Sequence, residues 1–497
     1  MTAQSDLRSL ILVGWLAASV SSSPAKPALI LPEGAVFGWT VRDAATDSVL
    51  EESSANQNFA PGSTLKLFTT WTALDLLGAD RTFVTELLYS GTIVEGNLQG
   101  DLIIKGGGNP GFADARLGTP QGPAAVFSDW ALILQKFGIS RVSGCVIGDG
   151  SYLLEEGPHP AMLWEDAGNY YAGTVSGLSF SGNIFIANFS GAPSPATPVT
   201  LLGTRPTHSG ITRFNNYLLT GPTNSEDSAY ILGGFPSMVR DLRGTYPAGQ
   251  MPFAIKGSLP NPAWTCAREF RDYLNANGIT VAPETAACGD SSALPNRSGT
   301  AGGVAISMAR HISPPLKELI RFTNQKSDNS YAAQFLALIG REGGQTGDWR
   351  GGLVVLNNYL AKRGFRSAEL HLKDGNGLSR YNWVSPNQTA HLLVYASRQK
   401  AFPDFRASLV GVSETADGSG SGSPEMRRKL ERYGNDWEGR LWVKTGTLEG
   451  VSALAGYLKP RSGRLLAFAI TVNNFEGTGY DMQKGFGPLL KEWAAKY

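Results

Sequence analysis

The pattern of apolar and polar positions predicts a hairpin at the start of the chain and a three-strand meander near its end. Strand-like residues fill 35–41, a polar turn covers 43–47, and a second strand begins at Ser48. The meander strands, each rich in apolar residues, cover 441–447, 451–457 and 465–472. A helical pattern over 482–496 closes the chain. Because strands from both ends can pair in one antiparallel sheet, we expect the two ends to form a single domain.

Helical periodicity appears elsewhere in the two outer parts of the sequence. An apolar helical pattern runs from Leu65 to Leu77 directly after a Pro-Gly break, which places Ser63 at or near a helix N-terminus. Further helical patterns lie near 301–341, 350–363 and 386–400. The middle of the chain differs, because short strand-like pieces alternate there with Gly, Asn and Pro.

These patterns predict an α/β protein. We expect 28–82 and 291–497 to form one discontinuous domain, an antiparallel sheet flanked by helices, and 83–290 to be a large, mostly β insertion. The length of 497 residues fits this division, since one hydrophobic core rarely serves so long a chain. With 42% hydrophobic and 17% charged residues, the composition is that of a folded soluble protein. A net charge of +1 and the lack of a Lys/Arg run argue against nucleic acid as a partner.

The first 27 residues differ in character from the rest. Arg8 precedes an apolar run at 9–20, and small residues and Pro24 follow. This order predicts a secretory signal, and therefore an exported protein that is periplasmic or associated with the cell wall. The run is too short for an ordinary transmembrane helix, so we expect no membrane anchor after leader removal. A buried or flexible N-terminal segment is the alternative interpretation.

The sequence gives no sign of a metal site or an organic cofactor. Its three cysteines, Cys145, Cys266 and Cys288, match no zinc-binding spacing, and it has neither a P-loop nor an H-E-x-x-H motif. In an oxidising compartment Cys266 and Cys288 could form a disulfide. Unpaired, partly buried thiols fit the sequence equally well.

A serine with a lysine base is the chemistry that the motifs favour. There is no G-x-S-x-G elbow, and none of the five histidines lies in a recognisable motif. Ser63 and Lys66 are three positions apart, which places both side chains on one face of a helix. A lysine whose pKa is lowered by burial can accept the serine proton. The same S-x-x-K spacing recurs at Ser397 and Lys400 in polar surroundings, so this motif alone is weak support.

Two further motifs follow in order. Ser327-Asp328-Asn329 precedes a helical pattern; its serine hydroxyl could relay a proton, and its amide could orient the lysine and accept a substrate N–H.

The third motif, Lys444-Thr445-Gly446, lies on a predicted strand. Lys444 would supply charge and Thr445 a hydroxyl for a substrate carboxylate, and Gly446 would let a substrate backbone approach the strand edge. The N–H groups of Thr447 and Ser63 could form an oxyanion hole.

Together, the three motifs resemble the signature set of penicillin-binding proteins and class A β-lactamases. Ser63 and Ser327 are much farther apart than in a β-lactamase. In this respect the chain resembles the D-alanyl-D-alanine carboxypeptidase/endopeptidase family, the low-molecular-mass class C penicillin-binding proteins, which carry an insertion at this place. Segments 100–110, 164–171 and 374–380 also resemble this family, although Asn109 and Asn376 stand where the family usually has Asp and Ser.

The resemblance implies a serine β-lactamase/DD-peptidase-like fold and acyl transfer without a cofactor. Ser63 would be the acylated nucleophile and Lys66 its base, Ser327 and Lys444 would share a proton relay, and Asn329 would position the substrate. The substrates would be peptidoglycan stem peptides and cross-links, and β-lactams would be inhibitors.

The resemblance also concerns substrate choice. Asp166 resembles an acid of the inserted domain that, in some members, binds the free amino group of a diaminopimelate side chain. Tyr171 falls where a neighbouring aromatic residue lines the same pocket. An ordinary surface or turn acid is the alternative for Asp166. The segment 412–428 is looser than the family's usual D-G-T segment, so substrate choice could differ.

Other functions remain open at this point. A β-lactamase or an esterase on the same fold would use the same motifs. A largely non-catalytic cell-wall binding protein, in which 83–290 does the binding, is an alternative from a different class.

Overall fold

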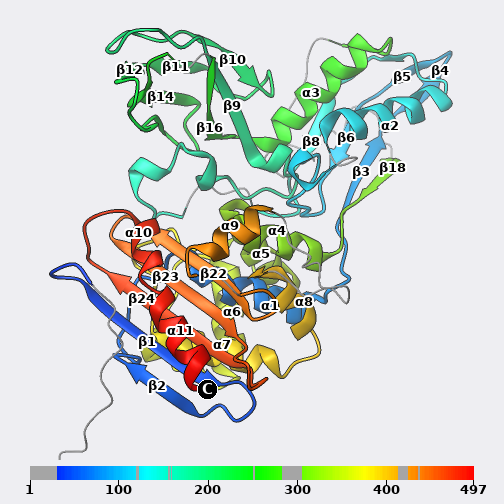
Figure 1. The fold of residues 1–497 in the computed structure, drawn as a ribbon. Coiled ribbons are helices and arrows are strands. Elements are labelled where there is room, and N and C mark those ends of the chain that lie inside the picture. The colour runs from blue at the N-terminus through cyan, green and yellow to red at the C-terminus, as the bar shows by residue number, and fades with distance from the viewer. Residues whose placement is uncertain are drawn as a thin grey trace, which may run out of the picture.

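The computed structural model describes residues 31–118, 122–154, 157, 159–249, 252–282, 305–411, 424–434 and 437–497. The leader at 1–27, Cys288 and residues 412–423 lie outside these ranges. Figure 1 shows two units, with a large sheet and its helices below and the inserted region above.

The large sheet has six strands in the order β2-β1-β24-β23-β22-β21, and neighbouring strands are antiparallel. Its strands are β1 (Val36–Asp43), β2 (Val49–Ser53), β21 (Val410–Gly411), β22 (Leu441–Leu448), β23 (Val451–Leu458) and β24 (Leu466–Asn473). β1 pairs with β24 along its whole length, from Val36 opposite Asn473 to Asp43 opposite Leu466. The predicted hairpin and meander are therefore confirmed, and both ends of the chain share one sheet.

Helices cover both faces of this sheet (Figure 1). They are α1 (Lys66–Leu77), α4 (Leu316–Lys326), α5 (Asn329–Glu342), α6 (Trp349–Ala361), α7 (Pro386–Ser397), α8 (Phe402–Ser408), α9 (Pro424–Glu431), α10 (Gly479–Lys484) and α11 (Gly487–Lys496). On one face, Trp493 of α11 packs against Trp39 and Phe468. On the other, α7 lies across β1, β23 and β24. Every residue of β23 and β24 is buried as a result.

The predicted closing helix is in fact two helices, α10 and α11. Pro488 lies in the first turn of α11, where its missing N–H costs no helical hydrogen bond. Within the described ranges, no helix combines the length and the apolarity needed to cross a bilayer.

Helix α1 lies inside the unit rather than on its surface. Residues Lys66 to Leu74 are all buried, so this part of the helix is enclosed on every side. Trp71 and Phe335 of the neighbouring α5 belong to the same apolar core. A polar side chain at the start of α1 is therefore removed from bulk water by the fold itself.

The helical pattern predicted near 301–341 is only partly correct. Residues Ile306–Ile312 form strand β18, and α4 and α5 follow it. β18 pairs with β3 (Val84–Tyr89) of the inserted region, with Ile312 opposite Val84. Pairing with β3 provides the backbone hydrogen bonds that a helix would have formed within itself. This pairing across the sheet therefore decided the structure of these residues, although their local pattern favoured a helix.

In its described residues, the inserted region contains two α-helices as well as strands. A four-stranded sheet, β18-β3-β6-β8, packs with α2 (Pro123–Lys136) and α3 (Pro262–Ala276) around Phe127, Trp130 and Phe270. The other strands are β4 (Thr92–Val94), β5 (Asn97–Gln99), β6 (Leu102–Lys105), β7 (Arg141–Val142), β8 (Val146–Asp149), β9 (Ile184–Phe189), β10 (Leu201–Arg205), β11 (Arg213–Asn216), β12 (Leu219–Gly221), β13 (Tyr230–Leu232), β14 (Val239–Arg243), β15 (Thr245–Pro247), β16 (Phe253–Ser258) and β17 (Thr280–Val281). Because β18 completes this sheet, we propose that the inserted unit extends to residue 312, beyond the predicted limit at 290.

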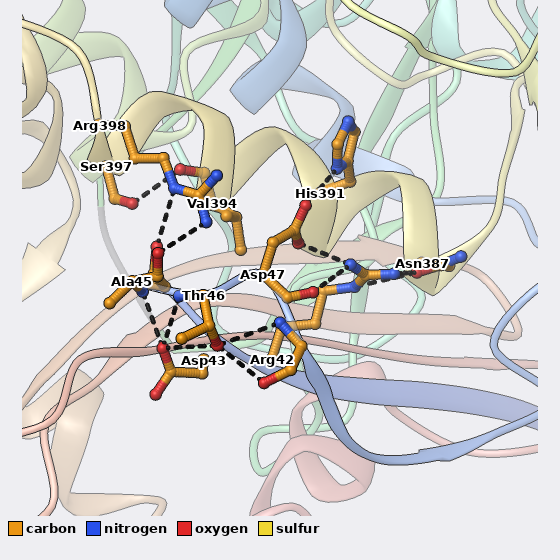
Figure 2. A network of polar contacts seen from close by, with 12 residues as sticks. Arg42, Asp43, Ala45, Thr46, Asp47, Asn387, His391, Val394, Ser397 and Arg398 are labelled. Atoms are coloured by element: carbon orange, nitrogen blue, oxygen red, sulfur yellow. Dashed lines mark hydrogen bonds and ion pairs between the residues drawn. The ribbon is translucent and has the colours of Figure 1, made fainter.

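The β1–β2 turn is fastened to α7 by a polar network (Figure 2). The Asp43 carboxylate accepts two backbone N–H bonds within the turn, each 2.9 Å long. Arg42 reaches Asn387 on α7 at 2.5 Å, and Arg398 at its end donates to the carbonyl of Ala45 at 3.0 Å. These contacts fix the edge hairpin against the helical layer.

Candidate active site

Ser63 lies in a 3-10 turn, Gly62–Leu65, that leads into α1. This position agrees with the predicted helix N-terminus. The turn is tight because Gly62 adopts φ +52. This backbone conformation is unfavourable for any residue that has a Cβ. A Cβ on Gly62 would lie only 2.9 Å from the backbone nitrogen of Thr447. The turn that carries Ser63 therefore abuts strand β22.

Lys66 points its amine at Ser63 from the first turn of α1. Its Nζ lies 2.8 Å from Ser63 Oγ, 2.5 Å from Asn329 Oδ1 and 2.6 Å from the backbone oxygen of Asn376. The side chain is fully buried. Burial lowers the pKa of Lys66 to about 7, against the opposing charges of Asp374 and Asp328.

The second motif lies between two helices. Ser327 ends α4 in the left-handed conformation, with φ 56, which is uncommon for a residue that has a Cβ. Asp328 begins α5, and its carboxylate accepts the N–H of Tyr331 at 3.0 Å. Asn329 then projects its amide oxygen to Lys66. The sharp reversal at Ser327 places its hydroxyl and the Asn329 amide at the same site.

The third motif lies on β22, beside the other two. Lys444 Nζ lies 2.9 Å from Ser327 Oγ and 2.8 Å from the carbonyl oxygen of Thr445. Burial, together with the nearby charge of Lys66, holds the pKa of Lys444 well below its usual range. Two lysine–serine pairs thus face each other, Lys66 with Ser63 and Lys444 with Ser327.

Gly446 meets the Ser63 turn directly. A Cβ at Gly446 would lie 2.3 Å from the carbonyl oxygen of Pro61 and 3.1 Å from the nitrogen of Ser63. Only glycine fits at position 446, because the turn that carries Ser63 packs directly against the strand there. The sequence did not reveal this reason. Strand β21 pairs only with Trp442 and Val443, so among the described residues the edge of β22 beyond them has no strand beside it.

A cleft of about 780 Å³ lies above these groups and is lined by residues of both units. Residues from both units form its wall, and the predicted ones among them are Ser63, Asp166, Tyr171, Ser327, Asn329 and Thr447. Lys66, Lys444 and Gly446 are buried beneath it, and Thr445 is half-buried and is not part of the cleft wall. The three motifs are thus brought to one cleft.

Asp166 and Tyr171 lie on the side of the cleft formed by the inserted unit. The Tyr171 hydroxyl donates to Asp166 Oδ1 at 3.0 Å. Burial raises the pKa of Asp166, and the hydrogen bond from Tyr171 opposes that rise. A partly buried carboxylate with one oxygen outside this bond is suited to a cationic group in the cleft.

The sequence did not assign a role to Asn376, yet its backbone carbonyl is a partner of Lys66. Asp374 fixes this loop, since its carboxylate accepts the N–H groups of Gly377 and Ser379, each at 2.7 Å. The side chain of Asn376 bonds instead to the N–H of Leu378 at 3.0 Å. The replacement of the family's usual Ser by Asn376 therefore leaves the contact to Lys66 intact, because that contact is made by the main chain.

Arg116 and Asp114, also unassigned from the sequence, tie the inserted unit to the second motif. Arg116 donates to Asp114 Oδ2 at 2.7 Å and to Asp328 Oδ2 at 2.9 Å. The Tyr331 hydroxyl donates to the same Asp114 oxygen at 2.7 Å. The N–H of Tyr331 also donates to Asp328, so these contacts form a closed ring next to Ser327 in the chain. No short motif marks these residues, because they come together only through the fold.

The second S-x-x-K sequence has none of these features. The Ser397 hydroxyl donates to the carbonyl of Val394 at 2.7 Å within its own helix (Figure 2), and Lys400 is exposed.

Over the part of the chain that the structure describes, no three His, Cys, Asp or Glu side chains are grouped so as to hold a metal ion.

Known proteins resemble this chain over nearly its whole length. The model of the D-Ala-D-Ala carboxypeptidase 3 (S13) family matches residues 16–496. A D-alanyl-D-alanine carboxypeptidase from an Actinomadura species is 29% identical, over 93% of this chain and 82% of its own length. D-alanyl-D-alanine carboxypeptidase DacB from Haemophilus influenzae is 24% identical, over 93% of this chain and 90% of its own.

Solved structures show the same fold. The crystal structure of penicillin binding protein 4 (dacB) from Haemophilus influenzae superposes with a TM-score of 0.75 at 22% identity, covering 94% of this chain and 98% of that one. The α/β fold with a large insertion, expected from the sequence, is thereby confirmed. Since the family model spans nearly the whole chain, this protein belongs to the D-Ala-D-Ala carboxypeptidase 3 family and is a serine-type peptidase.

Proposed function

We propose that the protein hydrolyses D-Ala-D-Ala ends and cross-links of peptidoglycan peptides through an acyl-enzyme on Ser63. The observation that carries this proposal is the buried amine of Lys66, 2.8 Å from the Ser63 hydroxyl. A neutral amine has two N–H donors and one lone pair. Asn329 Oδ1 and the Asn376 carbonyl accept the two N–H groups, which leaves the lone pair facing Ser63. Lys66 is then the base that takes the serine proton.

The acylation step follows from the positions of the other groups. Ser63 Oγ attacks the carbonyl carbon of the penultimate D-Ala while its proton passes to Lys66. The N–H groups of Ser63 and Thr447, brought together by the packing of the turn on β22, would hold the oxyanion. The peptide C–N bond then breaks, and the leaving amine takes a proton from Ser327, which Lys444 restores.

Hydrolysis completes the cycle. Water attacks the carbonyl carbon of the Ser63 ester and gives a proton through Ser327 to Lys444, which replaces the one lost during acylation. The C–O bond to Ser63 then breaks, Lys66 returns its proton to Ser63 Oγ, and the acyl group leaves as a carboxylic acid that ionises in water. When the leaving amine belongs to a neighbouring peptide rather than to D-Ala, the same steps cleave a cross-link. A β-lactam would acylate Ser63 in the same way; a Haemophilus influenzae relative of this fold has been solved with a bound β-lactam.

We also propose that Asp166 and Tyr171 bind the free amino group of a diaminopimelate side chain. Both line the cleft that holds Ser63, and the Tyr171 hydroxyl orients the carboxylate. A cation there would offset the burial that raises the pKa of Asp166.

The substrate lies at the cell wall, so we further propose that the segment 1–27 directs export to the periplasm or wall.

Intact-mass spectrometry with benzylpenicillin over time tests the proposal. We expect a lasting adduct of one penicillin per chain that is absent in Ser63→Ala. Ser397→Ala, at the second S-x-x-K sequence, is the matched control and should retain the adduct. D-Ala release from a pentapeptide, and cleavage of a cross-linked dimer, then measure the two peptidase activities.

The other outcomes separate the alternatives. A short-lived adduct with rapid consumption of penicillin would favour a β-lactamase. Binding to cell walls that is unchanged in Ser63→Ala, without D-Ala release, would favour a wall-binding protein. Folded protein that forms no adduct and releases no D-Ala would overturn the proposal.

A further inference from the structure

Thr447 is held from behind by helix α10. Gln483 Nε2 donates to Thr447 Oγ1 at 3.1 Å, while the methyl group of Thr447 occupies the space that a Cβ on Gly479 would need. Ser452, opposite Thr447 on β23, donates to the carbonyl of Gly479 at 3.1 Å and fastens α10 to the sheet. The Thr447 rotamer is therefore fixed by contacts on two sides.

The direction of the Gln483 amide is fixed as well. Arg432 donates from Nη1 to Gln483 Oε1 at 2.7 Å, and the Tyr433 hydroxyl points to the same oxygen at 3.4 Å. A guanidinium has no acceptor atom, so the end of the amide that faces it must be the oxygen. The guanidinium in turn lies over the ring of Tyr480, 4.6 Å from its centroid. Gln483 itself is buried, and its NH2 end is left facing Thr447.

This arrangement decides where the Thr447 proton goes. A hydroxyl has one proton to donate, and the Gln483 NH2 can only donate, so Thr447 Oγ1 is the acceptor in that pair. The described residues offer the hydroxyl proton no acceptor of its own, and Thr447 is exposed on the wall of the cleft that contains Ser63. The free proton is thus available to a ligand in the cleft.

We propose that Gln483 and Arg432 are positioning residues that hold the Thr447 hydroxyl as a donor to the terminal carboxylate of the substrate. The inference rests on the proposed function, which places the scissile carbonyl between the N–H groups of Ser63 and Thr447. The carboxylate lies three bonds beyond that carbonyl carbon, within reach of a side chain on Thr447. A hydroxyl that donates to a carboxylate makes one of the stronger hydrogen bonds. If the amide were reversed, its oxygen would take the proton and the donor would be lost.

Two thioesters with the same acyl group test this inference. Their leaving groups are thioglycolate and methyl thioglycolate, so only the first has a carboxylate, and thiol release measures both. The quantity to compare is the ratio of kcat/KM for the acid to kcat/KM for the methyl ester. Gln483→Glu keeps the side-chain shape and can pair with Arg432, yet it accepts the Thr447 proton. We expect this ratio to fall about tenfold or more, mainly through KM for the acid.

Further variants complete the test. Thr447→Val should lower the ratio to a similar extent, and the double variant Thr447→Val/Gln483→Glu should fall no further than either single variant. Arg432→Met, which frees the amide to reverse, should lower the ratio less. Lys484→Gln is the matched control on the same helix, since Lys484 is exposed and pairs with Asp481, and it should keep the wild-type ratio.

An unchanged ratio in Gln483→Glu together with a lowered ratio in Thr447→Val would overturn the role of Gln483. An unchanged ratio in Thr447→Val would overturn the whole inference. Wild-type protein that hydrolyses neither thioester and forms no penicillin adduct on Ser63 would overturn the proposed function first, which distinguishes the two failures. Thermal melting of each variant shows that the ratios are measured on folded protein.

Discussion

The protonation state of Lys66 makes the acylation rate depend on pH in a way that the structure specifies. Burial lowers the pKa of Lys66 to about 7, although the charges of Asp374 and Asp328 favour its charged form. Only the neutral amine can take the proton of Ser63. As pH falls through 7 the amine becomes an ammonium, so acylation should slow on the acid side and reach a plateau on the alkaline side.

The size of the effect follows from the fraction of neutral amine. With a pKa near 7 this fraction is about 9% at pH 6, about 50% at pH 7 and about 91% at pH 8, so acylation should be about tenfold slower at pH 6 than at pH 8. A lysine with its ordinary pKa, about 10.4, would instead give a rate that rises about tenfold for every pH unit up to 9. The plateau above pH 8 is therefore the distinguishing feature.

Stopped-flow measurement of Ser63 acylation tests this prediction between pH 5.5 and 9, with a chromogenic cephalosporin whose own groups do not titrate in that range. Lys444→Ala is the control, because Lys444 is also buried and its pKa is also lowered. The midpoint near 7 should persist in this variant at a reduced rate. A rate that stays constant from pH 6 to 8, or still rises steeply at pH 9, would refute Lys66 as a base tuned by burial.

Three further predictions concern the surroundings of the site. Arg116→Ala should slow acylation and lower the free energy of unfolding by about 1–3 kcal/mol, because Asp328 loses a charged partner; pre-steady-state kinetics and urea unfolding measure both. Gly62→Ala should reduce acylation more than it reduces stability, since its Cβ would displace the Thr447 nitrogen from 2.9 Å, and unchanged acylation would contradict this. Phe127→Ala should lower the free energy of unfolding of the inserted unit by about 3–5 kcal/mol in denaturant titrations, while folded protein still forms the penicillin adduct.

The sequence predicted the sheet and the placement of the Ser63 turn at the start of a helix well, because both depend on local patterns. The meander at 441–472 is a run of apolar strands with short turns, and β22, β23 and β24 begin and end within about a residue of the expected positions. Ser63 and Lys66 are only three positions apart in the chain, so one helical turn brings their side chains together. The order of the three motifs then indicated what they would form together.

The sequence failed where the structure depends on distant parts of the chain. Residues 306–312 form a strand because β3, more than two hundred residues earlier, offers a free edge. The two helices of the inserted unit, α2 and α3, begin with prolines at Pro123 and Pro262, which read as turn residues in a Gly- and Pro-rich region. Local signals were present there, but they were compatible with more than one structure.

The groups that hold the three motifs in place escaped notice for a different reason. Asn376 acts through its carbonyl, which every residue possesses, so its identity carries no signal. Arg116 holds Asp328 from a position 212 residues earlier in the chain, and its role exists only once the inserted unit rests on the second motif. Ser327 needs such support, because its left-handed backbone is unfavourable on its own. It follows that the inserted unit does more than line one side of the cleft: through Arg116 it holds Asp328, the residue between Ser327 and Asn329, so we expect changes within it to affect catalysis as well as substrate choice.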